Sequence, residues 1–259
     1  MSGIIGSVQA ELAIFKEAYK KYGFCELMAR SVRYFIWWSG NILIAFYYRH
    51  LKYLGKKKPF FIYKGEKYNY LYRSYNVTWE NERAVEVPIM WDIVKKSRGI
   101  RILEVGNVLR HYFHCNHDVV DLTEKYPGII NQDIVDFHPK AKYDLVISIS
   151  TFEHIGMCEE LVTEPTKVLD AVTNILENVL VVGGKFIITI PVGQNPELER
   201  YIVSGKLEFT DIACFKRLSD KSLSWKQVDW KEILNKEFTW DGVWCGTSRA
   251  FLIGTIQNI

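Results

Sequence analysis

Apolar residues recur with helical spacing near the start of the chain. Between residues 4 and 19 they fall three or four positions apart, as along one face of an amphipathic helix, and Gly23 ends the pattern. A second run, residues 34–48 (YFIWWSGNILIAFYY), is apolar nearly all round and precedes the basic stretch 56–58. These features predict a helical segment over residues 1–57.

The pattern changes between residues 58 and 99. Residues 59–72 (PFFIYKGEKYNYLY) turn at KGEK and predict a β-hairpin rich in aromatic side chains. The stretch that follows is typical of a helix from Thr78 to about Gly99, with a kink at Pro88. We therefore expect an aromatic hairpin and a covering helix ahead of the main sheet.

Beyond residue 100, β-rich apolar runs alternate with a helical pattern. The expected strands are 100–105, 117–121, 143–150, 184–192 and 250–257. A helix over 165–184, ended by Gly183-Gly184, separates the third strand from the fourth. Such alternation predicts an α/β fold over residues 100–259, with a mostly parallel Rossmann-like sheet. The last strand has no helix after it and is expected to form an antiparallel edge.

The positions just after each strand are informative, because ligands of such sheets bind at the carboxyl ends of the strands. Glu104 and Gly106 end the strand at 100–105, and Asp121 ends the next one. A carboxylate there can accept hydrogen bonds from both hydroxyls of a ribose. These residues predict a nucleoside site, and the alternative is that Glu104 only caps the following helix.

The turn after Gly106 differs from a dinucleotide-binding turn. Asn107 tolerates a left-handed backbone, as glycine does. Val108 and Arg110, however, stand where further glycines would line a pyrophosphate. The turn therefore favours a nucleoside without phosphates and disfavours a dinucleotide oxidoreductase.

Charge and cysteine content narrow the class of protein. The first sixty residues hold ten Lys/Arg against three Asp/Glu, a net +7, so a total of +3 leaves −4 for the rest. The basic character belongs to the N-terminal segment, and no nucleic-acid partner is expected. Five scattered cysteines without a CxxC pair favour a reducing compartment. With no secretory signal pattern at the start, we expect a cytoplasmic location.

A cluster of histidines raises the question of a metal site. The run RHYFHCNHD, residues 110–118, holds three histidines and a cysteine. No matching second half of a zinc site occurs elsewhere in the chain, so no metal is expected.

Five stretches, taken together, resemble the motifs of the class I S-adenosylmethionine-dependent methyltransferases. They are LEVGNVLRHY, DVVDL, NQDI, YDLVISISTFEHIG and LVVGGKFIITIPVG, in the family's order, and the match covers about residues 78–257. YNVTWENERAVEVP and IPVGQNP are also similar to a prokaryotic group of methyltransferases tied to surface-glycan assembly.

The resemblance implies S-adenosylmethionine as cofactor and assigns roles by position. The implied cofactor residues are Glu104, Gly106, Asn107, Asp121, Leu122, Asp133, Ile134 and Ser150. The expected substrate residues are Tyr75, Asn76, Glu82, Arg83 and Asn195. His154, together with Glu153, is the candidate catalytic base, because a neutral imidazole can remove a hydroxyl proton near neutral pH. The alternative is that His154 only anchors its loop or packs on the cofactor.

The expected reaction is O-methylation of a sugar or glycan-linked group, with a glycan acceptor that is either free or lipid-linked. The competing hypothesis is a non-catalytic, membrane-associated nucleoside-binding or scaffold protein of the same pathway. Residues 34–48 are too short to cross a bilayer as a helix. They are expected to pack on the core, to form a homo-oligomer interface, or to lie on the cytoplasmic face of the membrane.

Overall fold

The computed structural model describes residues 39–52, 54–158, 161–219, 223–233 and 248–259, together with residues 28, 32, 33 and 35–37. The chain divides into two compact units, Met1–Leu54 and Gly55–Ile259. The helix predicted between residues 4 and 19 lies outside the described residues.

The described part of the first unit is helical. Residues 39–46 form α-helix and continue into a π-helical turn, η1 (Tyr47–Leu51). Much of this segment's apolar surface is exposed, including Phe35, Trp37 and Leu43. In the part of the chain that the structure describes, no helix is long and apolar enough to cross a membrane.

The second unit begins with the predicted hairpin, which the structure confirms. β1 (Phe60–Tyr63) pairs antiparallel with β2 (Glu66–Asn69). The turn residues Lys64 and Gly65 both have left-handed φ angles, 48° and 80°. Glycine adopts this conformation without the steric cost that other residues meet, which explains the turn at KGEK.

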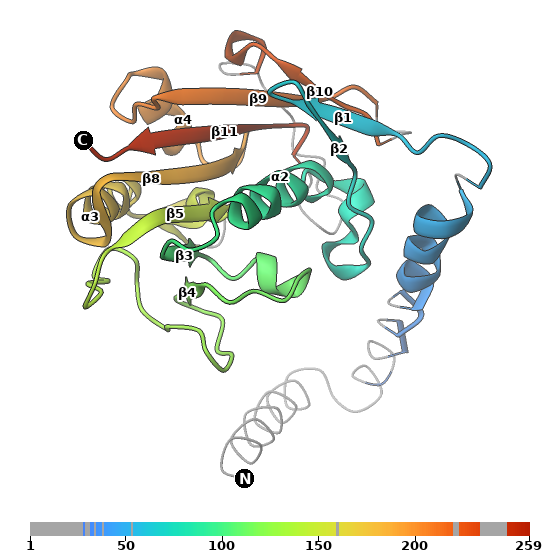
Figure 1. The fold of residues 1–259 in the computed structure, drawn as a ribbon, viewed down its shortest axis with the longest axis horizontal. Helices are drawn as coiled ribbons and strands as arrows, with labels where there is room; N and C mark the ends of the chain where they lie inside the picture. The colour runs from blue at the N-terminus through green and yellow to red at the C-terminus, as the bar shows by residue number, and fades with distance from the viewer. Residues whose placement is uncertain are drawn as a thin grey trace. The chain divides into compact units, whose positions relative to one another are not determined.

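The main sheet has seven strands in the order β10-β9-β11-β8-β5-β3-β4 (Figure 1). Its strands are β3 (Ile102–Val105), β4 (Asp118–Val120), β5 (Tyr143–Ile149), β8 (Leu180–Pro191), β9 (Asp211–Arg217), β10 (Trp225–Val228) and β11 (Ala250–Gln257). β4, β3, β5 and β8 are parallel, whereas β11 runs antiparallel between β8 and β9. The antiparallel edge is β10. The predicted Rossmann-like α/β class is confirmed, although the last strand of the chain lies inside the sheet instead of at its edge.

Helices cover the two faces of this sheet. The helices are α2 (Arg83–Lys96), α3 (Lys167–Asn174), which continues into η5 (Ile175–Val179), and α4 (Pro196–Val203). Apolar residues of α3 and α4 share one core with alternate residues of β3, β5 and β8, such as Leu103, Val146 and Ile188. α2 lies on the other face, where its Glu86 contacts Thr189 of β8. Successive side chains of a strand point to opposite faces, so the two layers draw on alternate strand positions.

Short turns and a small hairpin complete the described chain. They are the 3-10 turns η2 (Tyr75–Glu80), η3 (Leu109–His111), η4 (Phe152–His154) and η6 (Trp230–Glu232), and the strands β6 (Met157–Cys158) and β7 (Leu161–Val162).

The structure corrects two predicted boundaries. The covering helix begins at Arg83 instead of Thr78, because Asn81 has an extended backbone (φ −135°, ψ −177°) that separates the η2 turn from α2. β8 begins at Leu180, so the Gly183-Gly184 pair lies within the strand and does not end a helix. Gly183 has a φ of +79°, and the register of β5 with β8 shifts nearby. Both features are typical of a β-bulge.

Candidate functional site

Glu104, at the end of β3, holds the turn that follows it. Its side chain is fully buried, and one carboxylate oxygen accepts hydrogen bonds from the backbone N–H of Val108 (3.0 Å) and Leu109 (2.8 Å). The other oxygen lies 2.7 Å from Nε2 of His117, which is also buried. Glu104 thus makes the contacts expected of a residue that caps the following turn, and these contacts fix the shape of that turn.

Gly106 allows this turn to approach the end of β5. Its φ is +85°, and a Cβ atom there would lie 2.3 Å from Oγ1 of Thr151. Any other residue would therefore be strained and would collide with Thr151. The close approach brings the ends of β3 and β5 together at one edge of the sheet.

Asp121 joins the turn after β3 to the end of β4. Its carboxylate accepts hydrogen bonds from the backbone N–H of Asn107 (3.0 Å), Thr123 (2.9 Å) and Glu124 (2.8 Å). Partial burial alone would raise the pKa of Asp121, but these donors outweigh it and lower that pKa. Asp121 is therefore an ionised carboxylate that organises both loops.

Asn107, Asp121 and Glu124 form one polar corner beside the turn after β3, and the sequence analysis missed Glu124. Glu124 accepts a hydrogen bond from Nδ2 of Asn107 (2.9 Å) and lies 3.3 Å from Nε2 of His111. Tyr75 stacks on the His111 ring with centroids 4.2 Å apart and is half exposed. Only the position of Glu124, three residues after Asp121, could have suggested it, because its partners come from a different loop.

One atom of this corner is left without a partner. Oδ1 of Asn107 is buried and accepts no hydrogen bond from the residues that the structure describes. A buried acceptor costs free energy unless it is paired, so this atom is suited to a hydrogen-bond donor supplied by a ligand.

Three other predicted cofactor residues follow β4 in the chain, whereas Ser150 follows β5. Leu122 is exposed, and Ile134 is buried with its carbonyl accepting from Nδ2 of Asn174 (2.7 Å). Asp133 forms an ion pair with Lys167 of α3 (3.1 Å) and accepts from the N–H of Val135. Beyond β4, Ile130 forms a single parallel bridge with Val120.

A buried charged cluster lies under the end of β5. The Arg83 guanidinium donates to the carbonyls of Ile149 (3.1 Å) and Ser150 (3.3 Å) and pairs with Glu86 (3.1 Å). Glu86 accepts from the hydroxyls of Ser150 and Thr189, both at 2.7 Å. Arg83 and Glu86 thus tie α2 to the carboxyl ends of β5 and β8.

Two further carboxyl groups surround Arg83. Burial, and secondarily the charge of Glu86, raises the pKa of Glu82 to about 7. Burial also raises the pKa of Glu153 well above its ordinary value. Burial thus favours the protonated form of Glu153, and Oε2 of its carboxyl has no hydrogen-bond partner among the described residues.

His154 is the exposed member of the η4 turn. Its side chain is 70% exposed, and Nε2 lies 3.7 Å from a Glu153 oxygen. Desolvation by the surrounding protein, and secondarily the charge of Arg83, lowers the pKa of His154. Its imidazole is therefore neutral at pH 7 and is accessible to an acceptor.

The predicted substrate residues fall into two groups. Tyr75 and Asn76 are exposed next to the turn after β3. Asn195 caps α4 while donating to the Glu153 carbonyl (3.0 Å). Glu82 and Asn195 are buried and Arg83 is largely covered, whereas Tyr75 and Asn76 are open to solvent. Direct substrate contact stays a prediction for all five residues.

The histidine run carries no metal cluster in the part of the chain that the structure describes. His117 pairs with Glu104, and His111 lies between Tyr75 and Glu124.

Comparison with solved structures finds methyltransferases among the proteins to which this chain is similar. The N-methyltransferase NodS from Bradyrhizobium japonicum matches at 13% identity over 67% of this chain and 94% of its own, with a TM-score of 0.40. The sugar N-methyltransferase KedS8 from Streptoalloteichus matches at 18% identity over 51% and 53%, with a TM-score of 0.31. TehB from Haemophilus influenzae matches at 15% identity over 68% and 63%, with a TM-score of 0.38.

No protein-family model and no curated protein sequence matches the chain. The likeness to the solved structures is distant, and the fold class rests on the sheet described above. The chain has the Rossmann-like fold predicted from its resemblance to the class I S-adenosylmethionine-dependent methyltransferases.

Proposed function

We propose that the protein is an S-adenosylmethionine-dependent methyltransferase that acts on an oxygen of a sugar or glycan-linked group. The observation that carries the proposal is the meeting of the Gly106 turn, the ionised Asp121 and the exposed, neutral His154 at one edge of the sheet. Ligands of parallel sheets bind at this edge.

The residues present fit a nucleoside cofactor. Oδ1 of Asn107 is a buried acceptor without a partner among the described residues, and Leu122 is an exposed apolar side chain beside Asp121. S-adenosylmethionine, when bound, supplies a methyl group on a positively charged sulfur. The carboxylate of Asp121 favours ribose hydroxyls on one side of such a site.

His154 then provides the chemistry that a hydroxyl acceptor needs. The side chain of His154 would lie beside the acceptor hydroxyl, whose oxygen would take the methyl group that the bound cofactor supplies. The neutral imidazole holds the proton that leaves the hydroxyl. Incubation of the purified protein with labelled S-adenosylmethionine and a glycan extract tests the reaction directly. Labelled sugar is the expected product, and cofactor binding without transfer to any extract would favour the non-catalytic alternative.

Asp121→Ala is expected to weaken S-adenosylmethionine binding by about ten- to a hundredfold, because a charge-assisted acceptor contributes about 1.5–3 kcal/mol. Isothermal titration calorimetry measures the change. Asp136→Ala, which alters an exposed acid outside this corner, is the matched control. Equal affinities of wild type and Asp121→Ala would remove Asp121 from the cofactor site.

We also propose that the N-terminal segment attaches the enzyme to the cytoplasmic face of a membrane. The segment exposes bulky apolar and aromatic side chains, among them Phe35, Trp37 and Tyr47, and the exposed lysines 56–58 follow it. Aromatic rings favour the headgroup level, and lysines attract anionic lipid. Such attachment would place the enzyme on the same surface as a lipid-linked glycan.

The triple variant Lys56→Gln/Lys57→Gln/Lys58→Gln is expected to reduce binding to anionic liposomes about a hundredfold, since each lysine contributes about 1 kcal/mol near the surface. Liposome sedimentation at low salt measures the change. The control variant Lys140→Gln/Lys226→Gln/Lys231→Gln removes three exposed lysines of the second unit and should bind as wild type does. A wild-type protein that stays unbound would exclude membrane attachment.

A further inference from the structure

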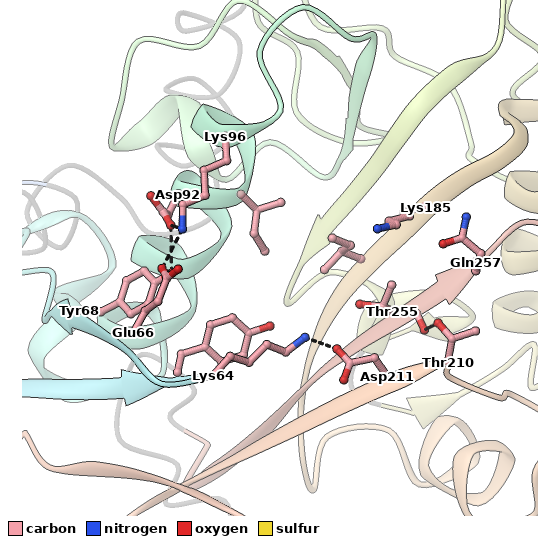
Figure 2. Close-up of a pocket in the computed structure, with 13 residues that line it drawn as sticks. Lys64, Glu66, Tyr68, Asp92, Lys96, Lys185, Thr210, Asp211, Thr255 and Gln257 are labelled. Atoms are coloured by element: carbon pink, nitrogen blue, oxygen red, sulfur yellow. Dashed lines mark hydrogen bonds and ion pairs between the residues drawn. The ribbon is translucent and has the colours of Figure 1, made fainter.

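A pocket lies away from the edge of the sheet that carries Gly106 and His154. Its volume is about 380 Å³, within the range of roughly 300–1,000 Å³ that is typical of small-molecule sites. The pocket is lined by the hairpin β1–β2, by α2, and by residues of β8, β9 and β11 (Figure 2). The pocket lies near the amino end of β5, because its lining residue Lys185 pairs with Leu145 near the start of that strand. The pocket is therefore at the opposite end of the strands from the proposed methyl-transfer site.

The charges that line this pocket are balanced. Lys64 pairs with Asp211 and so links the hairpin turn to β9 across the pocket (Figure 2). Lys96 pairs with Glu66 (2.7 Å) and Asp92 (2.9 Å). A polyanion such as a nucleotide needs an excess of positive charge or a row of backbone donors. The three carboxylates of the wall disfavour such a ligand.

One lining cation is left for a ligand. Lys185 is exposed and forms no ion pair with any residue in the described ranges. It lies beside Gln257, its partner in the β8–β11 pairing, on the side of the pocket away from the Lys96 group (Figure 2).

The remaining lining groups are hydroxyls, an amide and aromatic rings. Thr210, Thr255 and Gln257 line one side, and Tyr63 and Tyr68 line the other. The Tyr68 hydroxyl lies 2.9 Å from Asp92 and 3.1 Å from Glu66, and donating its one proton to either carboxylate fixes the ring at the wall. Only Ile93 and Ile187 among the lining residues are aliphatic, so the pocket does not suit an acyl chain.

We infer that this pocket binds a hexopyranose unit of a glycan. A sugar ring presents several hydroxyls that both donate and accept, and the wall offers carboxylates as acceptors and ammonium groups as donors within one small volume. The aromatic rings supply apolar surface for the C–H faces of the sugar. The choice of a glycan rests on the proposed function, and the pocket would hold a part of the acceptor remote from the methylated group.

The test is saturation-transfer NMR on the full chain with methyl hexopyranosides, glucuronate and inorganic phosphate as separate probes. Wild type is expected to bind at least one hexopyranoside with a dissociation constant in the millimolar range. Lys185→Ala and Asp211→Asn should each weaken that binding about tenfold, because each removes a charged partner of a hydroxyl. Lys226→Ala, an exposed lysine of β10 that does not line the pocket, is the matched control. Equal melting temperatures of the variants would show that both pocket variants are folded.

The outcomes separate this pocket from the transferase site. The inference is supported if Lys185→Ala weakens the hexoside signal and His154→Ala and Asp121→Ala leave it unchanged. This holds whether neutral sugars or glucuronate bind more tightly. A signal that survives both pocket variants but disappears in His154→Ala would put the sugar at the acceptor site and overturn the inference, leaving the methyltransferase proposal standing. Binding of phosphate alone, or of no probe, would also overturn it.

Discussion

His154→Ala is expected to lower the rate of methyl transfer by about two to four orders of magnitude, the usual contribution of a general base. S-adenosylmethionine affinity should change little, since the imidazole is 70% exposed and makes no hydrogen bond that anchors the Gly106 turn. Single-turnover kinetics with labelled cofactor and calorimetry measure the two quantities separately. The matched control is His138→Ala, an exposed histidine elsewhere on the second unit.

The pH dependence follows from the direction of the pKa shift. Desolvation and the Arg83 charge lower the pKa of His154 from an ordinary value near 6.5, so the base is neutral throughout the neutral range. The wild-type rate should fall only when the pH drops below about 6.5, and His154→Ala should lose that acidic limb. A variant that keeps its rate but loses cofactor affinity would assign His154 to the cofactor site. A milder loss is expected if the acceptor is a carboxylate or phosphate, which needs no base.

The sequence predicts those parts of the fold that depend on local patterns. The apolar runs that became β3, β5 and β11 are rich in β-branched residues, and the hairpin carries a glycine at the turn that needs a left-handed φ. β9 and β10 were not predicted. β9 reads DIACFKR and β10 reads WKQV, with polar residues in both, and their pairing with β11 and with each other is what makes them strands.

The sequence predicts which residues follow the strand ends and so share one edge of the sheet. It does not predict the hydrogen bonds that hold them there. The residues after β3, β4 and β5 do meet at one edge, because parallel strands end there. The contacts that fix them join residues far apart in the chain: Arg83 reaches the Ile149 carbonyl 66 residues away, and Glu86 reaches Thr189 across 103 residues. Nothing in a local pattern indicates that Glu82 is buried or that Arg83 hydrogen-bonds to the end of β5.

Arg83→Met is expected to destabilise the protein by about 3–5 kcal/mol at pH 8, because it leaves buried carboxylates without their cation. The guanidinium also donates to the carbonyls of Ile149 and Ser150, which would lose their side-chain donors. Urea unfolding followed by circular dichroism gives the free energy of unfolding. Arg98→Met, at an exposed position after α2, is the control and should change stability by less than about 0.5 kcal/mol.

The stability lost in Arg83→Met should increase as the pH rises. Burial raises the pKa of Glu82 to about 7 and that of Glu153 well above its ordinary value, and Arg83 opposes both shifts. An acid whose pKa is higher in the folded state binds more protons folded than unfolded, so its contribution to stability is present below the unfolded pKa near 4.5 and is lost as the pH rises. Without Arg83 both pKa values rise further, and the loss continues to higher pH.

Arg83→Met should therefore cost only about 1–3 kcal/mol at pH 5, because the raised pKa values of Glu82 and Glu153 favour their protonated forms there and the missing hydrogen bonds dominate. Arg83→Lys keeps the positive charge but not the planar fork that spans the two carbonyls, and its loss should vary less with pH. A destabilisation that is the same at pH 5 and pH 8 would mean that Glu82 and Glu153 do not depend on the charge of Arg83. The cluster would then position the end of β5 by its hydrogen bonds alone, and the His154 loop would be held by geometry without electrostatic support.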